Sequence, residues 1–178
     1  MNLATLTDSG RAALLAAVAA QPLHLAWGTG LAEWDGDNDQ AHLKVSLRPE
    51  TALVNEIGRR KINIIGFATP NPDGELVVPT GLLFSGEVEV LRYSIADTPT
   101  PNLYLKVAYD FGDACKDTIR EVGLFMATEV DQELPLGQRY FTPEQLADPG
   151  ILISIQRLNP VIARSPATRQ EFEFVLPI

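Results

Sequence analysis

The feature that most constrains the fold is an alternation of apolar and polar residues with a period of two, which returns through the second half of the chain. Asn102–Asp110 sets Leu and Val against Tyr and Lys, and Gln170–Leu176 sets Phe and Leu against Glu and Val. Such segments are typical of half-buried antiparallel strands, because successive side chains of a strand point to opposite faces. Other segments have the same alternation or a β-branched composition, namely Leu23–Trp27, Lys61–Phe67, Leu82–Leu91, Thr118–Ala127 and Gly150–Leu158. The sequence therefore predicts about six to eight strands.

One stretch near the start of the chain has helical character. Thr7–Gln21 offers capping side chains and then a run rich in alanine, and Pro22 follows as a stop. Its larger apolar residues, Leu14, Leu15 and Val18, form a narrow stripe that suits packing on a sheet or on neighbouring copies. We expect an α+β, mainly β fold in which this N-terminal helix packs on antiparallel sheets or a sandwich with long loops.

Shorter motifs predict turns and loops in the rest of the chain. Leu53–Ile57 is expected to form a short helical turn, and Asn71–Gly74 has the composition of a tight turn. Asp131–Pro149 and Asn159–Arg169 contain prolines and are expected to be long loops, either binding surfaces or plain insertions.

We expect a single domain over residues 1–178. Residues 1–22 would form its N-terminal helix, residues 23–127 its β core, and residues 128–178 its loops and closing strands.

Charge and composition exclude several classes of protein. Lys and Arg number 14 against 23 Asp and Glu, and the net charge of −9 disfavours binding to nucleic acid or to an anionic membrane. The single cysteine, Cys115, cannot form an internal disulfide, and two histidines are too few for a zinc module. The longest apolar run, Ala12–Ala20, is about half of a membrane span. We expect a soluble protein, made in the cytoplasm, with no cofactor and no bound metal.

No set of residues completes a known catalytic or ligand-binding motif. Gly28-Thr29-Gly30 follows a predicted strand, but Glu33 stands where a dinucleotide fingerprint needs its third glycine. Asp35, Asp37 and Asp39 start like a calcium loop, yet Gln40 and Ser46 replace the glycine and glutamate that the loop requires. A loose surface calcium site and a solvated acidic turn both remain open there.

The candidates for catalysis are equally incomplete. Neither His24 nor Cys115 has an assignable partner, and the chain has no Gly-x-Ser-x-Gly elbow. Glu87 and Glu89 would share one strand face as paired carboxylates do in glycosidases, but a solvated sheet face explains them better. We expect no enzymatic activity.

One group of motifs resembles a known family. Ile119–Phe125, with the sequence IREVGLF, is similar to a motif of phage tail-fibre and baseplate proteins, in the particle-attaching domain typical of tail-collar fibres. Three further blocks look like parts of the same domain, namely Leu6–Leu14 with the alanine-rich helix, Trp27–Gly30, and Thr51–Glu56 with Arg59, Lys61 and Ile62. The resemblance covers roughly residues 5–127.

The resemblance implies a structural component of a phage tail baseplate, either a wedge protein or an adaptor that attaches fibres. Long fibres continue into a shaft and a receptor-binding tip, whereas this sequence ends at Ile178, so we expect the attachment module alone. Its partners would be other baseplate proteins and the tail fibre, with several copies in the symmetric assembly of a virion tail.

Two other functions remain open. A host-receptor or carbohydrate-binding module would use Trp27, Trp34, Tyr104 and Tyr109 as stacking platforms if they were exposed together. A glycan-cleaving tail enzyme would use Glu87 and Glu89, or the carboxylates of Asp35–Asp39.

Five residues are expected to form the assembly interface. In the IREVGLF strand Arg120 and Glu121 are expected to point outward, away from a core made by its apolar residues, while Gly123 lets another backbone come close or allows a bulge. Arg157, Arg164 and Arg169 are expected to gather as a basic patch that meets an acidic segment such as Glu33–Asp39 on a neighbouring copy.

Overall fold

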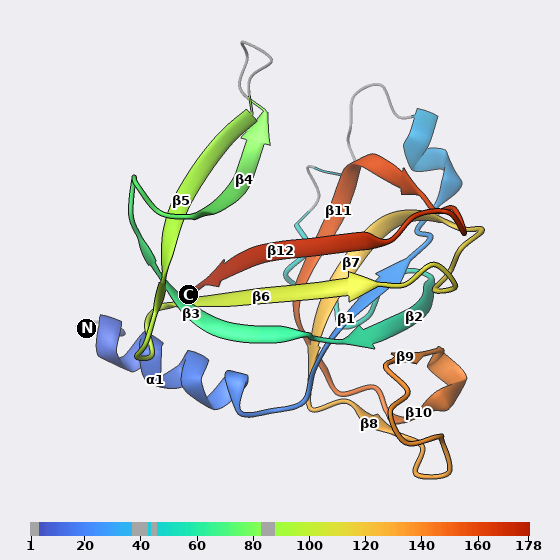
Figure 1. Cartoon of the computed structure of the whole chain (residues 1–178), viewed down its shortest axis with the longest axis horizontal. Helices are drawn as coiled ribbons and strands as arrows, with labels where there is room; N and C mark the ends of the chain where they lie inside the picture. Colours follow the sequence, from blue (N-terminus) through green and yellow to red (C-terminus); the bar gives the residue numbers. More distant parts are fainter. Residues whose placement is uncertain (1–3, 37–42, 44–45, 83–87) are drawn as a thin grey trace. The chain divides into compact units, whose positions relative to one another are not determined.

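The computed structural model describes residues 4–36, 43, 46–82 and 88–178, and it divides into two compact units (Figure 1). The first unit, hereafter the helix unit, contains Met1–Ala20, Asn63–Lys106 and Phe172–Ile178. The second, hereafter the motif unit, contains Gln21–Ile62 and Val107–Glu171. The predicted class is confirmed, since the chain is mostly β with a helix near its N-terminus and antiparallel sheets. That residues 1–178 act as one domain stays a prediction.

The helix unit contains the predicted N-terminal helix, α1 (Asp8–Ala19). Thr7 is its N-cap, and the Thr7 hydroxyl accepts a hydrogen bond of 3.2 Å from the backbone N–H of Gly10. Of the predicted apolar stripe, Leu15 is fully buried while Leu14 is half exposed. The side of α1 that carries Leu15 is therefore its packed side.

Five antiparallel strands form the sheet of the helix unit, in the order β12-β6-β3-β5-β4. Their bounds are β3 (Ile64–Pro70), β4 (Leu76–Leu82), β5 (Val88–Ala96), β6 (Asn102–Tyr109) and β12 (Gln170–Pro177). The last residues of β6 and the first of β12 belong to the motif unit. Ala68, Leu76, Tyr93 and Tyr104 form a core cluster on this sheet, with Val175 packed against it.

The turn predicted at Asn71–Gly74 is confirmed. The Asn71 side-chain oxygen accepts from the N–H of Asp73 at 3.1 Å, and the N–H of Gly74 donates to the Asn71 carbonyl at 2.9 Å. This turn joins β3 to β4, and both strands then pair with β5.

The motif unit has a second antiparallel sheet, in the order β11-β7-β1-β2-β9. Its strands are β1 (Leu23–Gly28), β2 (Glu56–Lys61), β7 (Thr118–Met126), β9 (Tyr140–Phe141) and β11 (Ile151–Ala163). A separate pair consists of β8 (Glu129–Val130) and β10 (Leu146–Asp148), and two short 3-10 helices are η1 (Ala32–Gly36) and η2 (Pro143–Gln145). All six residues of the central strand β1 are buried.

Several predicted boundaries are wrong. The helical turn expected at Leu53–Ile57 is absent because Glu56 already begins β2, which pairs with β1. The strand expected over Lys61–Phe67 is interrupted, since β2 ends at Lys61 and β3 starts at Ile64. The strand expected over Leu82–Leu91 is split between the end of β4 and the start of β5. Pairing with distant strands, which local sequence does not reveal, sets these limits.

The two predicted loops contain regular structure. β11 continues to Ala163, so the segment expected as a loop over Asn159–Arg169 is extended for its first half. Its pairing with β7 is interrupted between Arg157 and Ile162, a stretch that contains Pro160, which has no N–H to donate. Asp131–Pro149 holds β9, η2 and β10 and is therefore a folded excursion.

Candidate assembly site

Three of the four motif blocks lie far apart in the sequence but meet within the motif unit. The N–H of Thr29 donates to the Asn55 carbonyl at 3.0 Å, and the Asn55 side-chain amide donates to the Thr29 hydroxyl at 2.5 Å. The N–H of Asn55 donates to Glu121 Oε1 at 3.2 Å. The turn after β1, the segment before β2 and the strand β7 are thus tied by direct hydrogen bonds.

Glu121 is fully buried, so the prediction that it points outward is wrong. A Cβ placed on Gly28 would lie 2.7 Å from Glu121 Oε1 and 2.8 Å from the Asn55 carbonyl oxygen. Only glycine at position 28 leaves room for the carboxylate at this depth. Burial raises the pKa of Glu121, opposed by hydrogen bonds from the backbone of Asn55 and Val54.

Arg120 is paired within its own chain. Its Nε and Nη2 atoms donate to the Asp35 carboxylate at 2.8 and 2.6 Å, and Nη1 donates to the Thr29 carbonyl at 2.9 Å. The hydrogen bond to Asp35 raises the pKa of Arg120. Asp35 is thereby neutralised by a guanidinium, which competes with any cation at that carboxylate, while Asp37 and Asp39 lie outside the described residues.

Gly123 in the same strand is approached closely by side chains, whereas the expectation was another backbone or a bulge. A Cβ on this residue would lie 2.8 Å from a methyl carbon of Leu152 and 3.0 Å from one of Leu53. Ala26, Leu53 and Phe125 form the adjoining core cluster. The IREVGLF strand therefore stabilises the interior of the motif unit through its glycine and apolar residues, and through its glutamate as well.

Sequence reasoning assigned no role to Arg59, which is 1% exposed. Its guanidinium donates twice to the Glu56 carboxylate at 2.8 Å, and also to the Thr128 hydroxyl at 2.8 Å and the Pro149 carbonyl at 2.6 Å. It also lies 3.9 Å above the ring of Phe125. The sequence does contain a signal for such ion pairs inside the protein: two adjacent arginines, at positions 59 and 60, lie within the segment predicted to form the β core.

Arg60 is the centre of a second group of contacts. It donates to Asp110 at 2.8 Å and forms a close ion pair with Asp113. Arg169 also pairs with Asp110, with its Nε 3.0 Å from the carboxylate. The hydrogen bond from Arg60 is the main cause of a lowered pKa at Asp110.

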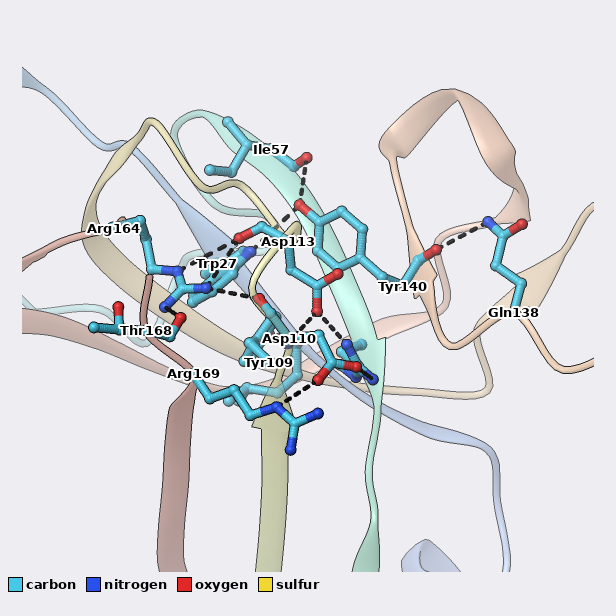
Figure 2. Close-up of polar contacts among 12 residues, drawn as sticks. Trp27, Ile57, Tyr109, Asp110, Asp113, Gln138, Tyr140, Arg164, Thr168 and Arg169 are labelled. Atoms are coloured by element: carbon cyan, nitrogen blue, oxygen red, sulfur yellow. Dashed lines mark hydrogen bonds and ion pairs between the residues drawn. The ribbon is translucent and has the colours of Figure 1, made fainter. Parts of the chain in front are cut away.

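Arg164 is buried, so the basic patch does not form as predicted. Its guanidinium donates to backbone carbonyls of Asp110 at 2.8 Å, Thr168 at 3.1 Å and Asp113 at 3.3 Å (Figure 2). It also lies 5.1 Å from the ring of Trp27. These bonds hold the chain that follows β11 against the segment after β6.

The other two arginines of the predicted patch differ from Arg164 and from each other. Arg157 is half-buried with its guanidinium 4.5 Å from the ring of Trp34, whereas the Arg169 side chain is 63% exposed. That Arg120, Glu121, Arg157, Arg164 and Arg169 form an interface stays a prediction, and burial of Glu121 and Arg164 argues against those two.

Three of the four aromatic residues named for a glycan-binding module are buried, so they form no exposed platform with the half-buried Trp34. Trp27 and Tyr109 are completely buried and stack on each other with ring centroids 3.5 Å apart, and Tyr104 is 6% exposed. The Tyr140 hydroxyl donates to the Ile57 carbonyl at 3.1 Å and accepts from the Trp27 indole at 3.4 Å. Burial raises the pKa of Tyr140 to about 12.

The whole chain was compared with known proteins. A model of the family of baseplate wedge 3 tail fiber network components matches residues 3–178. The chain belongs to this family. No curated protein matches it. The suspected relationship to phage baseplate and tail-fibre proteins is thereby confirmed, and the role is that of a structural component of the phage virion tail.

For this wedge family member, the proposed catalytic and metal-binding groups are not assembled in the part of the chain that the structure describes. No three His, Cys, Asp or Glu side chains lie there at metal-binding distances, and no helix there is long and apolar enough to cross a membrane. Glu87 lies outside the described residues, as does the side chain of Glu89. Cys115 is half-buried and has no disulfide partner.

The wedge protein is expected to lose stability as the pH falls from 6.5 to 4, because of His24. Burial, and then the charges of Arg59 and Lys61, lower the pKa of His24 from 6.5 to about 4. The unfolded chain therefore takes up a proton in this range while the folded protein does not, which costs about 3 kcal/mol at pH 4 relative to pH 7.

Denaturant unfolding at pH 7, 5.5 and 4 measures this loss, with His24→Leu as the matched variant. His24 Nδ1 has no hydrogen-bond partner among the described residues, so leucine removes the titration without removing a bond at that atom. The variant should show a shallower pH dependence than the wild type. Equal slopes would show that another group causes the acid sensitivity.

One exposed apolar structure of this wedge family member lies in the helix unit. β5 pairs with β3 only from Tyr93 to Ala96, and from Val88 to Arg92 its strand partner among the described residues is β4 alone. The two strands thus continue past β3 as a two-stranded ribbon, visible in Figure 1. We call this part, Val77–Leu82 with Val88–Arg92, the ribbon.

The ribbon exposes apolar side chains on both of its faces. Val77, opposite Arg92, and Val90, opposite Pro79, lie on one face and are 46% and 43% exposed. Leu91, opposite Val78, lies on the other face and is 49% exposed. Because an isolated two-stranded hairpin is marginal in water, a partner that covers both faces would stabilise it.

Proposed function

We propose that this protein is a fibre-attachment adaptor of the baseplate wedge, which acts only by protein–protein assembly and inserts its ribbon into an apolar cleft of the tail fibre. The observation that carries the proposal is the exposure of Val77, Val90 and Leu91 on a two-stranded extension of the sheet. Apolar side chains on both faces fit a cleft better than a flat surface, since a flat partner would leave one face in water.

The proposal extends to the setting of the protein. It is made in the host cytoplasm and then incorporated in several copies, because a symmetric baseplate repeats its components. The net charge of −9 makes nucleic acid and anionic membrane poor partners. The proposed role does not include catalysis, because the residues of the family motifs form hydrogen bonds within the protein.

Changing Val90 and Leu91 to aspartate together is expected to prevent fibre attachment without unfolding the protein. Both side chains are already half exposed, so two charges there add little burial cost, and Tm should stay within roughly 5 °C of the wild type. A phage that lacks the gene is complemented with the variant, and purified particles are assayed for fibre content and infectivity. The expected particles lack fibres.

The matched control is Val90→Ile with Leu91→Met, which keeps both faces apolar and should give particles with fibres. Fibre-bearing, infectious particles built with the aspartate variant would overturn the ribbon as the attachment element. Release of sugar from host surface glycan by the purified wild-type protein would overturn the non-catalytic part of the proposal.

A further inference from the structure

The folded excursion Asp131–Pro149 in the motif unit contains a fully exposed leucine. Leu136 has a relative exposure of 104%. It lies in a tight turn in which the N–H of Gln138 donates to the Pro135 carbonyl at 3.2 Å, and Gly137 has a φ of +91°. Glycine is favoured there because other residues rarely adopt that φ.

Hydrogen bonds within the folded excursion fix the segment that follows the turn. The Gln138 side-chain amide donates to the Tyr140 carbonyl at 2.9 Å and to Gln145 Oε1 at 3.0 Å, and the same oxygen accepts from the N–H of Thr142 at 3.1 Å. The N–H of Asp131 donates to the Gln145 carbonyl at 3.0 Å. Leu136 is therefore presented on a fixed support, which lowers the entropy cost of placing it in a partner.

A groove with a mainly apolar lining, which suits a leucine side chain, lies along β11 in the same unit. Its volume is about 410 Å³. Four of the residues that line it are apolar and two are charged, namely Leu47, Leu152, Ile153 and Ile155 with Arg48 and Glu50. Among the described residues β11 has a strand partner, β7, on one side only, so the groove lies beside an open strand edge.

We propose that Leu136 of one copy inserts into the β11 groove of a second copy, which joins copies head to tail. Leu136 is fully exposed, and among the described residues the groove is open to solvent, although Leu152 and Ile155 in its lining also pack against the core of their own chain. The charges at the two sites also complement each other. Exposed Glu133 and Arg139 flank the leucine, and exposed Arg48 and Glu50 flank the groove, so each side offers one cation and one anion.

A contact between two different surfaces of the same chain has a consequence for assembly. After two copies bind, the pair still has one free leucine, on one copy, and one free groove, on the other, so the contact repeats until a ring closes or a filament grows. A ring of adaptors would fit a symmetric baseplate. This contact uses the motif unit only, and it is independent of the ribbon and of the tail fibre.

Cross-linking between two different variants tests the contact directly. Leu136→Cys and Ile153→Cys are made separately in a Cys115→Ser background, mixed, and oxidised mildly. A disulfide-linked dimer that requires both variants is expected, while each variant alone should stay uncross-linked. Dimers of equal yield from one variant alone, or none from the mixture, would overturn the proposal.

Affinity gives a second readout on the intact protein. Leu136→Asp should weaken self-association measured by sedimentation velocity by roughly ten- to a hundredfold, as expected for loss of one buried leucine side chain. Leu136→Met should retain it. Because residue 136 is fully exposed, both variants should unfold at the wild-type temperature. Unchanged association in the aspartate variant would contradict the proposal, whereas the ribbon variant should associate normally.

Discussion

Replacing Arg59 with methionine is expected to lower the free energy of unfolding by about 3–5 kcal/mol, the range seen when one partner of a buried ion pair is removed. The guanidinium is 1% exposed and donates to Glu56, Thr128 and Pro149. Methionine retains apolar contact with Phe125 but leaves the Glu56 carboxylate and the Pro149 carbonyl without this donor. The cost is therefore electrostatic rather than a packing loss.

Urea or guanidinium unfolding measures the change, and two further variants identify its cause. Arg59→Lys keeps the charge but not the two parallel hydrogen bonds to Glu56, so it should fall between wild type and Arg59→Met. Adding Glu56→Gln to Arg59→Met should recover part of the loss, because no unpaired carboxylate then remains. A loss below about 1 kcal/mol for Arg59→Met would show that water replaces the guanidinium at little cost.

Elements whose residues interact locally were predicted well. The helix is encoded by its cap, its alanines and the proline that follows, and the structure places α1 over Asp8–Ala19. The alternation in Asn102–Asp110 appears as β6 (Asn102–Tyr109), and that in Gln170–Leu176 as β12. These patterns depend on the geometry of a single segment, so a single segment is enough to read them.

The orientation of charged side chains was predicted poorly in the motif unit. A glutamate that follows an arginine in a strand is expected to point its side chain toward solvent from one face of the sheet. The side chain of Glu121 is instead fully buried. Its partner, Asn55, is 66 residues away, and the partner of Arg120, Asp35, is 85 residues away. No periodic pattern contains such information, because it arises only when distant segments pack.

The family resemblance and the fold can be related physically. Trp27–Gly30, Thr51–Glu56 and the IREVGLF strand are separate in sequence, and the structure joins them through Thr29, Asn55 and Glu121. Each block needs the others, since Gly28 leaves room for the carboxylate and Asn55 donates to it. Their joint presence therefore indicates one packed unit.

Reversing the charge of Arg164 is expected to destabilise the fold by about 3–5 kcal/mol, whereas reversal of Arg169 should cost about 1 kcal/mol or less. Arg164 is 7% exposed and donates to three backbone carbonyls; a glutamate there would lose these bonds and place a carboxylate among acceptors. Arg169 is 63% exposed and pairs with the partly exposed Asp110.

The two reversals differ mainly in burial, so denaturant unfolding of Arg164→Glu and Arg169→Glu distinguishes structure from interface. If a double variant, Arg164→Glu with Arg169→Glu, failed to assemble, the unfolding caused by Arg164→Glu would explain the failure. Only the single variant Arg169→Glu therefore tests whether this region contacts a neighbouring protein. If Arg169→Glu is as stable as wild type yet fails to enter particles, Arg169 belongs to an interface. Equal stability of Arg164→Glu and wild type would instead show that the Arg164 bonds to the carbonyls of Asp110, Asp113 and Thr168 are replaced by water without loss.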